Sequence, residues 1–233
     1  MIWLRTILIF DNGNIARTQD WSDIHSSYVN AIKSITSPNK KTLILRCKSK
    51  DPVSGKWRRN GVAYLKKQFL KGMNDEIWKS EVNLNIEHLA WQPALSLYPG
   101  LGVYREPITS SFGGFDFLKK TSSGLRIAIE WETGNISSTH RSLNKLVIAL
   151  KAGEIDAGVL ILPSRDLYSH LTDRIGNIGE VSPYLTLWNS ASQLVERGLL
   201  AISVVEHDEL TDDASHPYLK VGDDGRAREG RGK

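Results

Sequence analysis

The chain contains a single cysteine, Cys47, among its 233 residues. One thiol cannot form a disulfide within the chain, and it cannot build a zinc site that needs several thiolates. Cysteine usage of this kind is typical of proteins in a reducing cytoplasm, which is where we expect this protein. The six histidines are scattered without the close spacing of metal-ligand pairs, so a histidine-based metal site is not indicated.

Long hydrophobic runs are also missing. No stretch approaches the roughly 20 apolar residues that span a bilayer, so we expect no membrane partner. The first ten residues, MIWLRTILIF, are interrupted by Arg5 and lead to Asp11 rather than to a small-residue cleavage site. They predict a first β-strand rather than a secretion signal. Gly100 and Gly102 lack the third glycine of a dinucleotide-binding turn.

The bulk composition is that of an ordinary globular protein, with 40% hydrophobic and 24% charged residues. The formal net charge of +4 suits a polyanionic partner such as nucleic acid, although many enzymes are mildly basic. From Asp208 onward the composition becomes polar, charged and rich in glycine. We therefore predict one domain over residues 1–208, followed by a flexible C-terminal arm over residues 209–233.

The central stretch runs from Leu125 to Leu150 and reads LRIAIEWETGNISSTHRSLNKLVIAL. Apolar and polar residues alternate up to Glu132, which predicts a strand that ends in two carboxylates, Glu130 and Glu132, on one face. A polar loop follows. Leucines and a valine then recur at spacings of three and four, which predicts a helix with one buried face.

Upstream, the segment FDFLKKTSSG places Asp116 in a short aromatic run before a turn, which is a hairpin pattern. Antiparallel pairing brings Asp116 beside Glu130 and Glu132. A solvated, charged strand face is one reading of the two glutamates. In the other, three carboxylates in one place repel each other unless a cation neutralises them, and oxygen-only ligands favour Mg²⁺. Such clusters commonly hydrolyse phosphodiesters.

A second polar segment, SKDPVSGKWRRNG, has two readings. Lys56, Trp57, Arg58 and Arg59 are suited to gripping phosphate. Alternatively, the segment is only the solvated tip of a hairpin.

The order of elements predicts an α/β fold with a mixed central β-sheet flanked by helices. Gly153 is expected to cap the central helix, and the apolar run that follows predicts a buried strand, so that strand, helix and strand form a crossover. Ser164 is expected to cap a helix. Further elements are expected as helices over residues 22–35, 61–77 and within 180–196, and strands over 40–48 and 199–205.

The run EWETGNISSTHRSLNKL at 130–146, continued by KAGEID at 151–156 and YSHLTDR at 168–174, resembles the BamHI-like type II restriction endonucleases of the PD-(D/E)xK superfamily. The resemblance covers roughly residues 112–187 and extends through loop residues that packing does not dictate, which makes it specific. The usual lysine of the superfamily is replaced by Glu132. Ala152 departs from a histidine in the resembling enzyme.

This resemblance implies a restriction-endonuclease-like core and hydrolysis of double-stranded DNA that leaves 5′-phosphate ends. It implies one or two Mg²⁺ ions per site, held by Asp116, Glu130 and the carbonyl of Trp131, with Glu106 as a further ligand. Alternatively, Glu106 is a surface charge beside a proline turn. Glu132 would accept a proton from the attacking water or orient it, which a charged lysine cannot do.

The resemblance also implies a set of residues that contact DNA and the palindromic site GGATCC. Arg141 and Arg174 would contact guanines, Asp173 cytosines, and Asn135 and Ser137 the central pairs. Asp224 and Gly225 match an arm that enters the minor groove. Alternatively, Asn135 and Ser137 only cap the following helix, a role we expect of one of the serines, and Asp173 and Arg174 form a surface ion pair.

A palindromic site is best matched by a homodimer, with the helix over residues 142–151 contributing to the interface, and the resemblance implies a cognate methyltransferase in the same system. Two rival functions are a DNA-binding regulator on the same scaffold that does not cut, and a repair nuclease that recognises DNA structure. The carboxylate cluster argues against the first, and the base-reading residues argue against the second.

Overall fold

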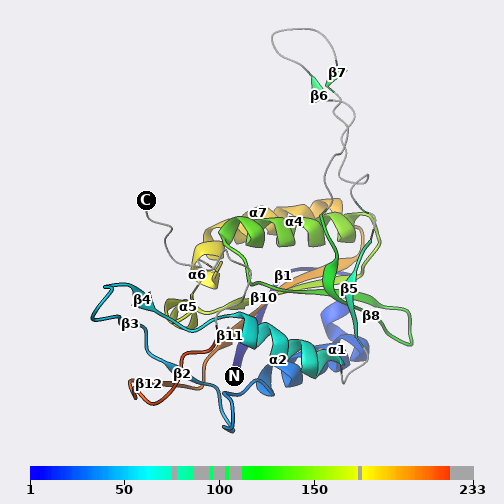
Figure 1. The fold of residues 1–233 in the computed structure, drawn as a ribbon. Coiled ribbons are helices and arrows are strands. Elements are labelled where there is room, and N and C mark those ends of the chain that lie inside the picture. The colour runs from blue at the N-terminus through cyan, green and yellow to red at the C-terminus, as the bar shows by residue number, and fades with distance from the viewer. Residues whose placement is uncertain are drawn as a thin grey trace.

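The computed structural model describes residues 1–74, 78–84, 86, 95–96, 103–104, 112–172 and 175–220. Figure 1 shows the fold. The elements in chain order are β1 (Ile2–Asn12), η1 (Ile15–Arg17), α1 (Gln19–Lys33), β2 (Ile44–Arg46), β3 (Ser49–Lys50), β4 (Trp57–Arg58), α2 (Ala63–Asn74), β5 (Lys79–Val82), β6 (Leu95–Ser96), β7 (Val103–Tyr104), β8 (Phe115–Lys120), β9 (Arg126–Trp131), α4 (Ile136–Lys151), β10 (Ala157–Pro163), α5 (Arg165–Ser169), α6 (Ile178–Val181), η2 (Ser182–Tyr184), α7 (Leu185–Ser190), η3 (Ala191–Leu194), β11 (Gly198–Glu206) and β12 (Glu209–Thr211).

A six-stranded sheet in the order β1-β11-β10-β9-β8-β5 forms the centre of the fold. Its middle strands β9, β10 and β11 are parallel, and β1, β8 and β5 add to it in antiparallel pairs. The predicted α/β class with a mixed central sheet is therefore confirmed, as is the strand–helix–strand order β9-α4-β10.

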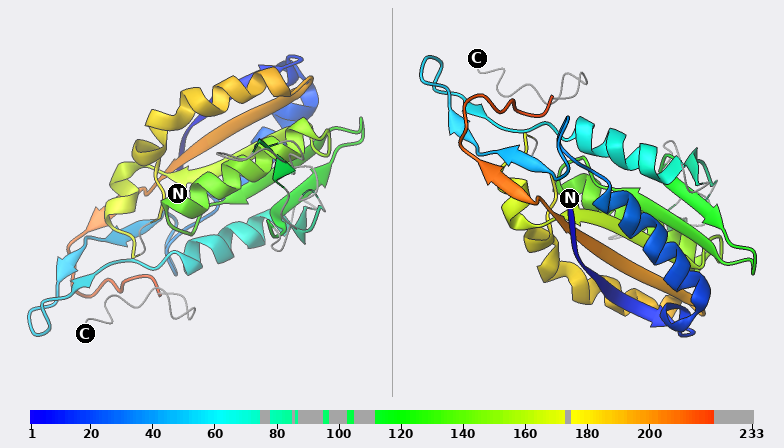
Figure 2. Two further views of the ribbon diagram at one scale, coloured as in Figure 1. Left: turned by 90° about the horizontal axis from the view of Figure 1, so that it is seen from above. Right: turned by 90° about the horizontal axis from the view of Figure 1, so that it is seen from below.

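Helices cover both faces of this sheet. Figures 1 and 2 show α4 and α7 on one face and α1 and α2 on the other. Two buried apolar clusters correspond to these layers, and they meet at the sheet itself. The predicted strands and helices along the chain are present in the described residues, with boundaries that differ by a few residues.

Strand β9 shows the alternation that the sequence predicts. Ile127, Ile129 and Trp131 belong to the apolar cluster beneath α1 and α2, whereas Ala128 belongs to the cluster beneath α4. In the described residues, β8 pairs with β9 as the hairpin pattern predicts, with Phe117 opposite Ile129. The hairpin places the end of β9 at the start of β8.

The central helix α4 begins at an N-cap, Asn135, whose side chain accepts a hydrogen bond of 3.2 Å from the backbone N–H of Ser138. Our expectation that a serine caps this helix is therefore wrong, because the preceding asparagine already supplies the cap. At the other end, Gly153 adopts φ +68°, a left-handed conformation that glycine takes without strain and that ends the helix. Ser164 caps α5 as predicted, by accepting a hydrogen bond from Leu167.

The segment after Asp208, which we expected to begin a flexible arm, packs on the domain as far as the structure describes it. Strand β12 pairs in parallel with β2, and Leu219 is only 5% exposed. Apolar side chains such as Leu219 can be buried within a segment whose average composition is polar, and composition alone does not reveal this. Residues 221–233 lie outside the described residues.

Asn60 joins three segments that are distant in sequence. Its fully buried side chain donates to the carbonyls of Arg46 at 2.8 Å and His170 at 3.0 Å, and it accepts from the N–H of Leu219 at 3.2 Å. The backbone N–H of Asn60 also donates to His170, and its carbonyl accepts from Thr172. The start of α2, the chain after α5 and the C-terminal segment are thereby tied together. None of the helices in the described residues is long and apolar enough to cross a membrane.

Replacement of Asn60 by alanine leaves buried backbone groups of Arg46, His170 and Leu219 without these partners. We expect Asn60→Ala to lower the free energy of unfolding by about 2–4 kcal/mol, as measured by urea denaturation. Asn30→Ala, at an exposed position of α1, serves as the control and should change it by less than about 0.5 kcal/mol. Equal effects of the two substitutions would contradict this role for Asn60.

Candidate active site

Asp116 lies near the start of β8, opposite the end of β9. One residue further along, the register pairs Phe117 with Ile129, so Asp116 comes next to Glu130. Its Oδ2 accepts a hydrogen bond of 2.8 Å from the backbone N–H of Trp131. Its Oδ1 pairs with the ammonium group of Lys66, on α2, at 2.9 Å. Asp116 is therefore held to β9 by the backbone and to α2 by an ion pair.

Glu130 is 6% exposed and forms an ion pair with Lys145 of α4, which is itself 5% exposed. The ammonium group of Lys145 also donates to the carbonyl of Gly114 at 2.8 Å and lies 4.6 Å from the ring centroid of Phe115. A buried lysine needs such partners, because an unpaired buried charge is strongly destabilising. Lys145 thus links α4 to the hairpin that carries Asp116.

Glu132 follows the last residue of β9 and is 7% exposed. Its Oε1 accepts a hydrogen bond of 2.5 Å from the backbone N–H of Gly134. Its Oε2 is buried without a hydrogen-bond partner among the described residues, although the Thr139 hydroxyl is close enough to affect the pKa of this carboxyl. The reading of Glu130 and Glu132 as a solvated face is therefore wrong, since both are buried.

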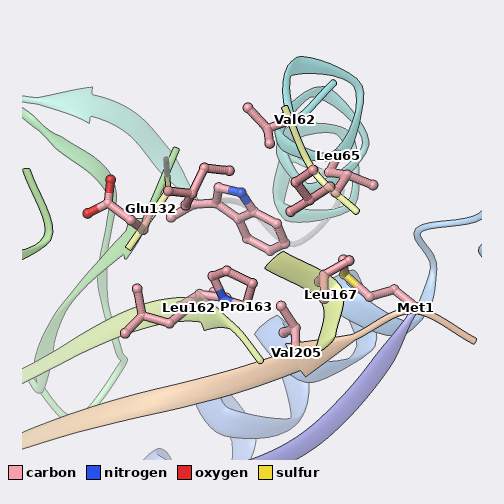
Figure 3. Close-up of a pocket in the computed structure, with 12 residues that line it drawn as sticks. Met1, Val62, Leu65, Glu132, Leu162, Pro163, Leu167 and Val205 are labelled. Atoms are coloured by element: carbon pink, nitrogen blue, oxygen red, sulfur yellow. The ribbon is translucent and has the colours of Figure 1, made fainter. Parts of the chain in front are cut away.

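An apolar pocket lies behind Glu132. It is lined by Trp131, Leu65 and Val62 together with residues at the ends of β10 and β11 and in α5. Figure 3 shows that the carboxylate of Glu132 is directed away from Val62, Leu65 and Leu167. The apolar wall keeps water from one side of the group.

The pKa of Glu130 is raised to about 7. Burial is the main cause, the Lys145 ammonium opposes it, and the nearby charge of Asp116 adds to it. Burial also raises the pKa of Glu132, against the hydrogen bond from Gly134, and Asp116 again adds to the shift. Burial disfavours the charged form of Lys66, but the Asp116 carboxylate outweighs this and raises the pKa of Lys66. The three carboxylates therefore interact electrostatically.

The donor chemistry of this cluster fits a hard divalent cation. All its ligand atoms are carboxylate oxygens, and Glu132 Oε2 is buried without a hydrogen-bond partner in the described part of the chain. Among the described residues, no three aspartate, glutamate, histidine or cysteine side chains lie close enough together to hold a metal ion. Lys66 and Lys145 instead provide the positive charge. A cation would compete with these two ammonium groups for Asp116 and Glu130.

The side chains predicted to read DNA bases lie beside the cluster. Asn135, Ser137 and Arg141 are all exposed on the first two turns of α4. Asn135 uses its side-chain oxygen as the helix cap, so the capping alternative holds for this atom. Ser137 and Arg141, four residues apart, share one face of the helix. The first turns of α4 thus present polar groups within a few residues of Glu132.

The segment that carries the second predicted pair of base-reading residues is anchored next to the first. Ile175 forms a β-bridge with Asn135, and the N–H of Gly176 donates to the carbonyl of Gly134 at 3.2 Å. A Cβ atom at Gly176 would lie 1.9 Å from the Thr139 hydroxyl oxygen, so only glycine permits this approach. On the other side, Leu171 bridges to Asn60. Both flanks are therefore fixed at the end of the sheet where β9 ends.

Several predicted site residues lie outside the described residues, namely Glu106, Asp173, Arg174, Asp224 and Gly225. Conversely, our sequence reasoning missed Lys66 and Lys145 as members of the site. A signal for Lys145 was present, because it falls among the buried positions of an amphipathic helix, between Leu143 and Leu146. A lysine there requires a buried acid as partner.

The class of protein follows from this fold and site together with three comparisons. By structure, the chain is similar to the restriction endonuclease BglII complexed with a DNA 16-mer, with a TM-score of 0.54 and 9% identity over 88% of this chain and 79% of that one. At this identity the likeness concerns the fold, which is that of a restriction endonuclease.

The model of the restriction endonuclease BamHI family matches residues 1–226, and the chain belongs to this family. It is 47% identical to the type II restriction enzyme OkrAI of Oceanobacter kriegii over 46% of this chain and 54% of that enzyme. It is 52% identical to the type II restriction enzyme BamHI of Bacillus amyloliquefaciens over 27% of this chain and 29% of that enzyme. The matches thus span about half or less of these relatives. Restriction endonucleases in general require a divalent metal ion.

The raised pKa of Glu130 predicts how the stability of the metal-free protein depends on pH. The folded state holds this proton up to about pH 7, whereas the ordinary value is 4.5. The free energy of unfolding should therefore fall as pH rises through this window, by on the order of 3 kcal/mol from this group.

Glu130→Gln removes the titrating group and serves to isolate its contribution. Urea denaturation of both proteins with a chelator present, from about pH 4.5 to about pH 8, measures the difference between their unfolding free energies. The free energy of unfolding of the variant should increase relative to that of the wild type as pH rises. A difference that does not change with pH would contradict the buried state of this carboxyl.

Proposed function

We propose that this protein is a type II restriction endonuclease that hydrolyses double-stranded DNA at GGATCC with Mg²⁺ and leaves 5′-phosphate ends. The observation that carries the proposal is the combination of a buried carboxylate cluster, Asp116, Glu130 and Glu132, with exposed polar side chains on the first turns of α4. Membership of the BamHI family supports it.

The proposed metal ligands are Asp116, Glu130 and the backbone carbonyl of Trp131, with Glu106 completing the set for one or two Mg²⁺ ions. When bound, Mg²⁺ supplies charge neutralisation at the phosphate and lowers the pKa of water. The hydrogen bond from the Trp131 N–H to Asp116 and the ion pair of Glu130 with Lys145 hold these two carboxylates in place, which supports the proposal. The lysines maintain the cluster before the metal arrives.

Glu132 is the proposed proton acceptor. Its Oε1 is fixed by Gly134, which leaves the buried Oε2 to accept a proton from the attacking water. The water oxygen forms a bond to phosphorus, the bond from phosphorus to the 3′ oxygen breaks, and a second water gives its proton to that oxygen. The products are a 5′-phosphate and a 3′-hydroxyl. Burial raises the pKa of Glu132, which strengthens it as a base.

Sequence recognition is assigned to two neighbouring segments. Arg141 and Arg174 donate to guanine, Asp173 accepts from the amino group of cytosine, and Asn135 and Ser137 face the central pairs. Because Asn135 uses its side-chain oxygen as a cap, its amide nitrogen is the group available to a base. The anchored flanks of residues 173–174 support this arrangement. Asp224 and Gly225 are proposed to reach the minor groove from a C-terminal arm that follows the docked residues 209–220.

A homodimer is proposed, with α4 in its interface and one protomer for each half of the palindrome. The layer that contains α4 also exposes large apolar side chains: Leu187 is 64% exposed and Leu194 59%. Trp188 of α7 donates to Asn144 of α4 at 3.1 Å, so these elements form one surface. Large exposed apolar side chains on this layer support an interface. A cognate methyltransferase is the further partner expected.

Digestion of a plasmid of known sequence by the purified protein, with Mg²⁺ and with a chelator, tests the proposal when the ends are mapped. Mg²⁺-dependent fragments with 5′-phosphates at GGATCC are expected. Discrete cuts at other sequences would refute the assigned recognition site but retain the nuclease. Tight binding to a GGATCC duplex without any cutting would favour the alternative function, a sequence-specific DNA-binding regulator on this scaffold.

Glu132→Ala removes the proposed proton acceptor without touching the base-reading side chains. We expect cleavage to fall by about a hundredfold or more, whereas the affinity for a GGATCC duplex should change little. Glu196→Ala, an exposed position just before β11, is the matched control and should cut normally. Cleavage at the normal rate by Glu132→Ala would show that another group accepts the proton.

A further inference from the structure

The hairpin formed by β3 and β4 is not used by the site described above. Figures 1 and 2 show it projecting beyond the rest of the described fold, at the end of the molecule where α5 and α6 lie. Residues 48–59 contain five lysines and arginines and one aspartate. Their net charge of +4 equals that of the whole chain, so the remaining residues are balanced in charge. The excess positive charge of the protein is concentrated here.

The hairpin is pre-organised by its own turn. Asp51 accepts hydrogen bonds from the N–H groups of Val53 at 3.0 Å and Ser54 at 2.8 Å, and it forms an ion pair with Arg58. Gly55 adopts φ +66°, which closes the turn. The one negative charge of the segment is thus engaged inside the turn. A rigid hairpin loses less conformational entropy on binding than a flexible loop.

The lysines are gathered around an exposed aromatic ring. Trp57 is 41% exposed, and the ammonium groups of Lys48 and Lys50 lie 5.8 Å and 5.5 Å from its ring centroid. Lys56 and Lys50 are exposed to solvent. Lys48 and Lys50 hold their ammonium groups over the Trp57 ring, and Lys56 adds an exposed charge next to it in the chain, so the hairpin presents positive charge suited to phosphates.

The base of the hairpin is fixed to the segment that leads to the proposed base-reading residues. Lys48 N–H donates to His170 Nδ1 at 3.2 Å, and Asn60 exchanges backbone hydrogen bonds with His170 and Thr172. On its other side the hairpin leads directly into α2, which carries Lys66 of the carboxylate cluster. The hairpin is therefore anchored at the same end of the sheet as the cleavage site.

We propose that the β3–β4 hairpin binds the phosphate backbone of the duplex outside the recognition sequence, through Lys48, Lys50 and Lys56. The inference rests on the proposed function and adds a contact to it that does not depend on sequence. At roughly 3.3 Å per residue, the hairpin reaches about 17–20 Å from Asn60 to its tip, which corresponds to about five or six base pairs. The contact thus falls on flanking DNA and raises affinity for any sequence there.

The test compares two charge-matched double variants by fluorescence anisotropy of duplex binding with Ca²⁺ in place of Mg²⁺, over a range of salt concentrations. Lys50→Gln with Lys56→Gln removes two charges from the hairpin. Arg17→Gln with Lys120→Gln removes two exposed charges at the opposite end of the sheet. The duplexes carry GGATCC or a scrambled site, with either about two or about eight flanking base pairs on each side.

The hairpin variant should lose affinity for long duplexes of both sequences, and the slope of log K against log salt should fall by about two per chain. On short duplexes it should match the wild type. The control variant should match the wild type on all duplexes. A hairpin variant that behaves like the control would overturn the inference while the proposed function stands.

A footprint on the wild-type protein adds a test that needs no substitution. Lysines are acetylated with and without the long duplex and analysed by mass spectrometry. Lys50 and Lys56 should be protected by DNA, whereas Lys120 should not. Equal acetylation of Lys50 and Lys56 in both conditions would overturn the inference. If the wild type does not prefer GGATCC over the scrambled duplex, the proposed recognition of GGATCC fails instead.

Discussion

Three buried carboxylates at the end of the sheet where β9 ends set the main constraint on this structure. Asp116, Glu130 and Glu132 would repel one another and resist burial without positive charge nearby. Lys66 supplies it from α2 on one face of the sheet, and Lys145 supplies it from α4 on the other. The cluster therefore ties together the sheet and both helical layers.

These ion pairs also explain how the proposed cation site can remain folded without a cation. The Glu130–Lys145 pair is buried, whereas Lys66 is partly exposed; burial raises the pKa of Glu130 although the Lys145 ammonium opposes the shift. The metal-free arrangement is thus held together but costly in free energy. A divalent cation in place of the lysines would compensate the negative charge of the carboxylates more fully, which would favour its binding. The incompletely compensated charge of the three carboxylates is thus the proposed cause of metal binding.

The segments proposed to recognise DNA lie near the same end of the sheet. The loop after β9 leads into the exposed first turns of α4, and the segment after α5 is anchored against it through Ile175 and Gly176. Asn60 attaches the basic hairpin to the other flank of that segment. The residues proposed for cleavage, base reading and backbone contact thus lie on neighbouring loops of one sheet, which holds their relative positions.

Much of this arrangement was predictable from the sequence, because β9 and α4 have clear periodicities. The β8–β9 hairpin, the crossover to β10 and the position of Asp116 beside Glu130 followed from local patterns. Lys66 and Lys145 were missed because their partners are far away in sequence, and only the packing of α2 and α4 on the sheet brings them together. The cap of α4 was misassigned to a serine, since several residues at that turn can supply the same oxygen. The docking of residues 209–220 was hidden by their polar composition.

A crystal structure of the complex with a GGATCC duplex and Mn²⁺, with anomalous scattering data, tests the central claim most directly. The account predicts an anomalous peak coordinated by Asp116 and Glu130, next to a phosphate and within reach of Glu132, with at least one of the two lysines displaced from its carboxylate. A peak at another place on the protein, with Lys66 and Lys145 still paired in the DNA-bound state, would contradict it.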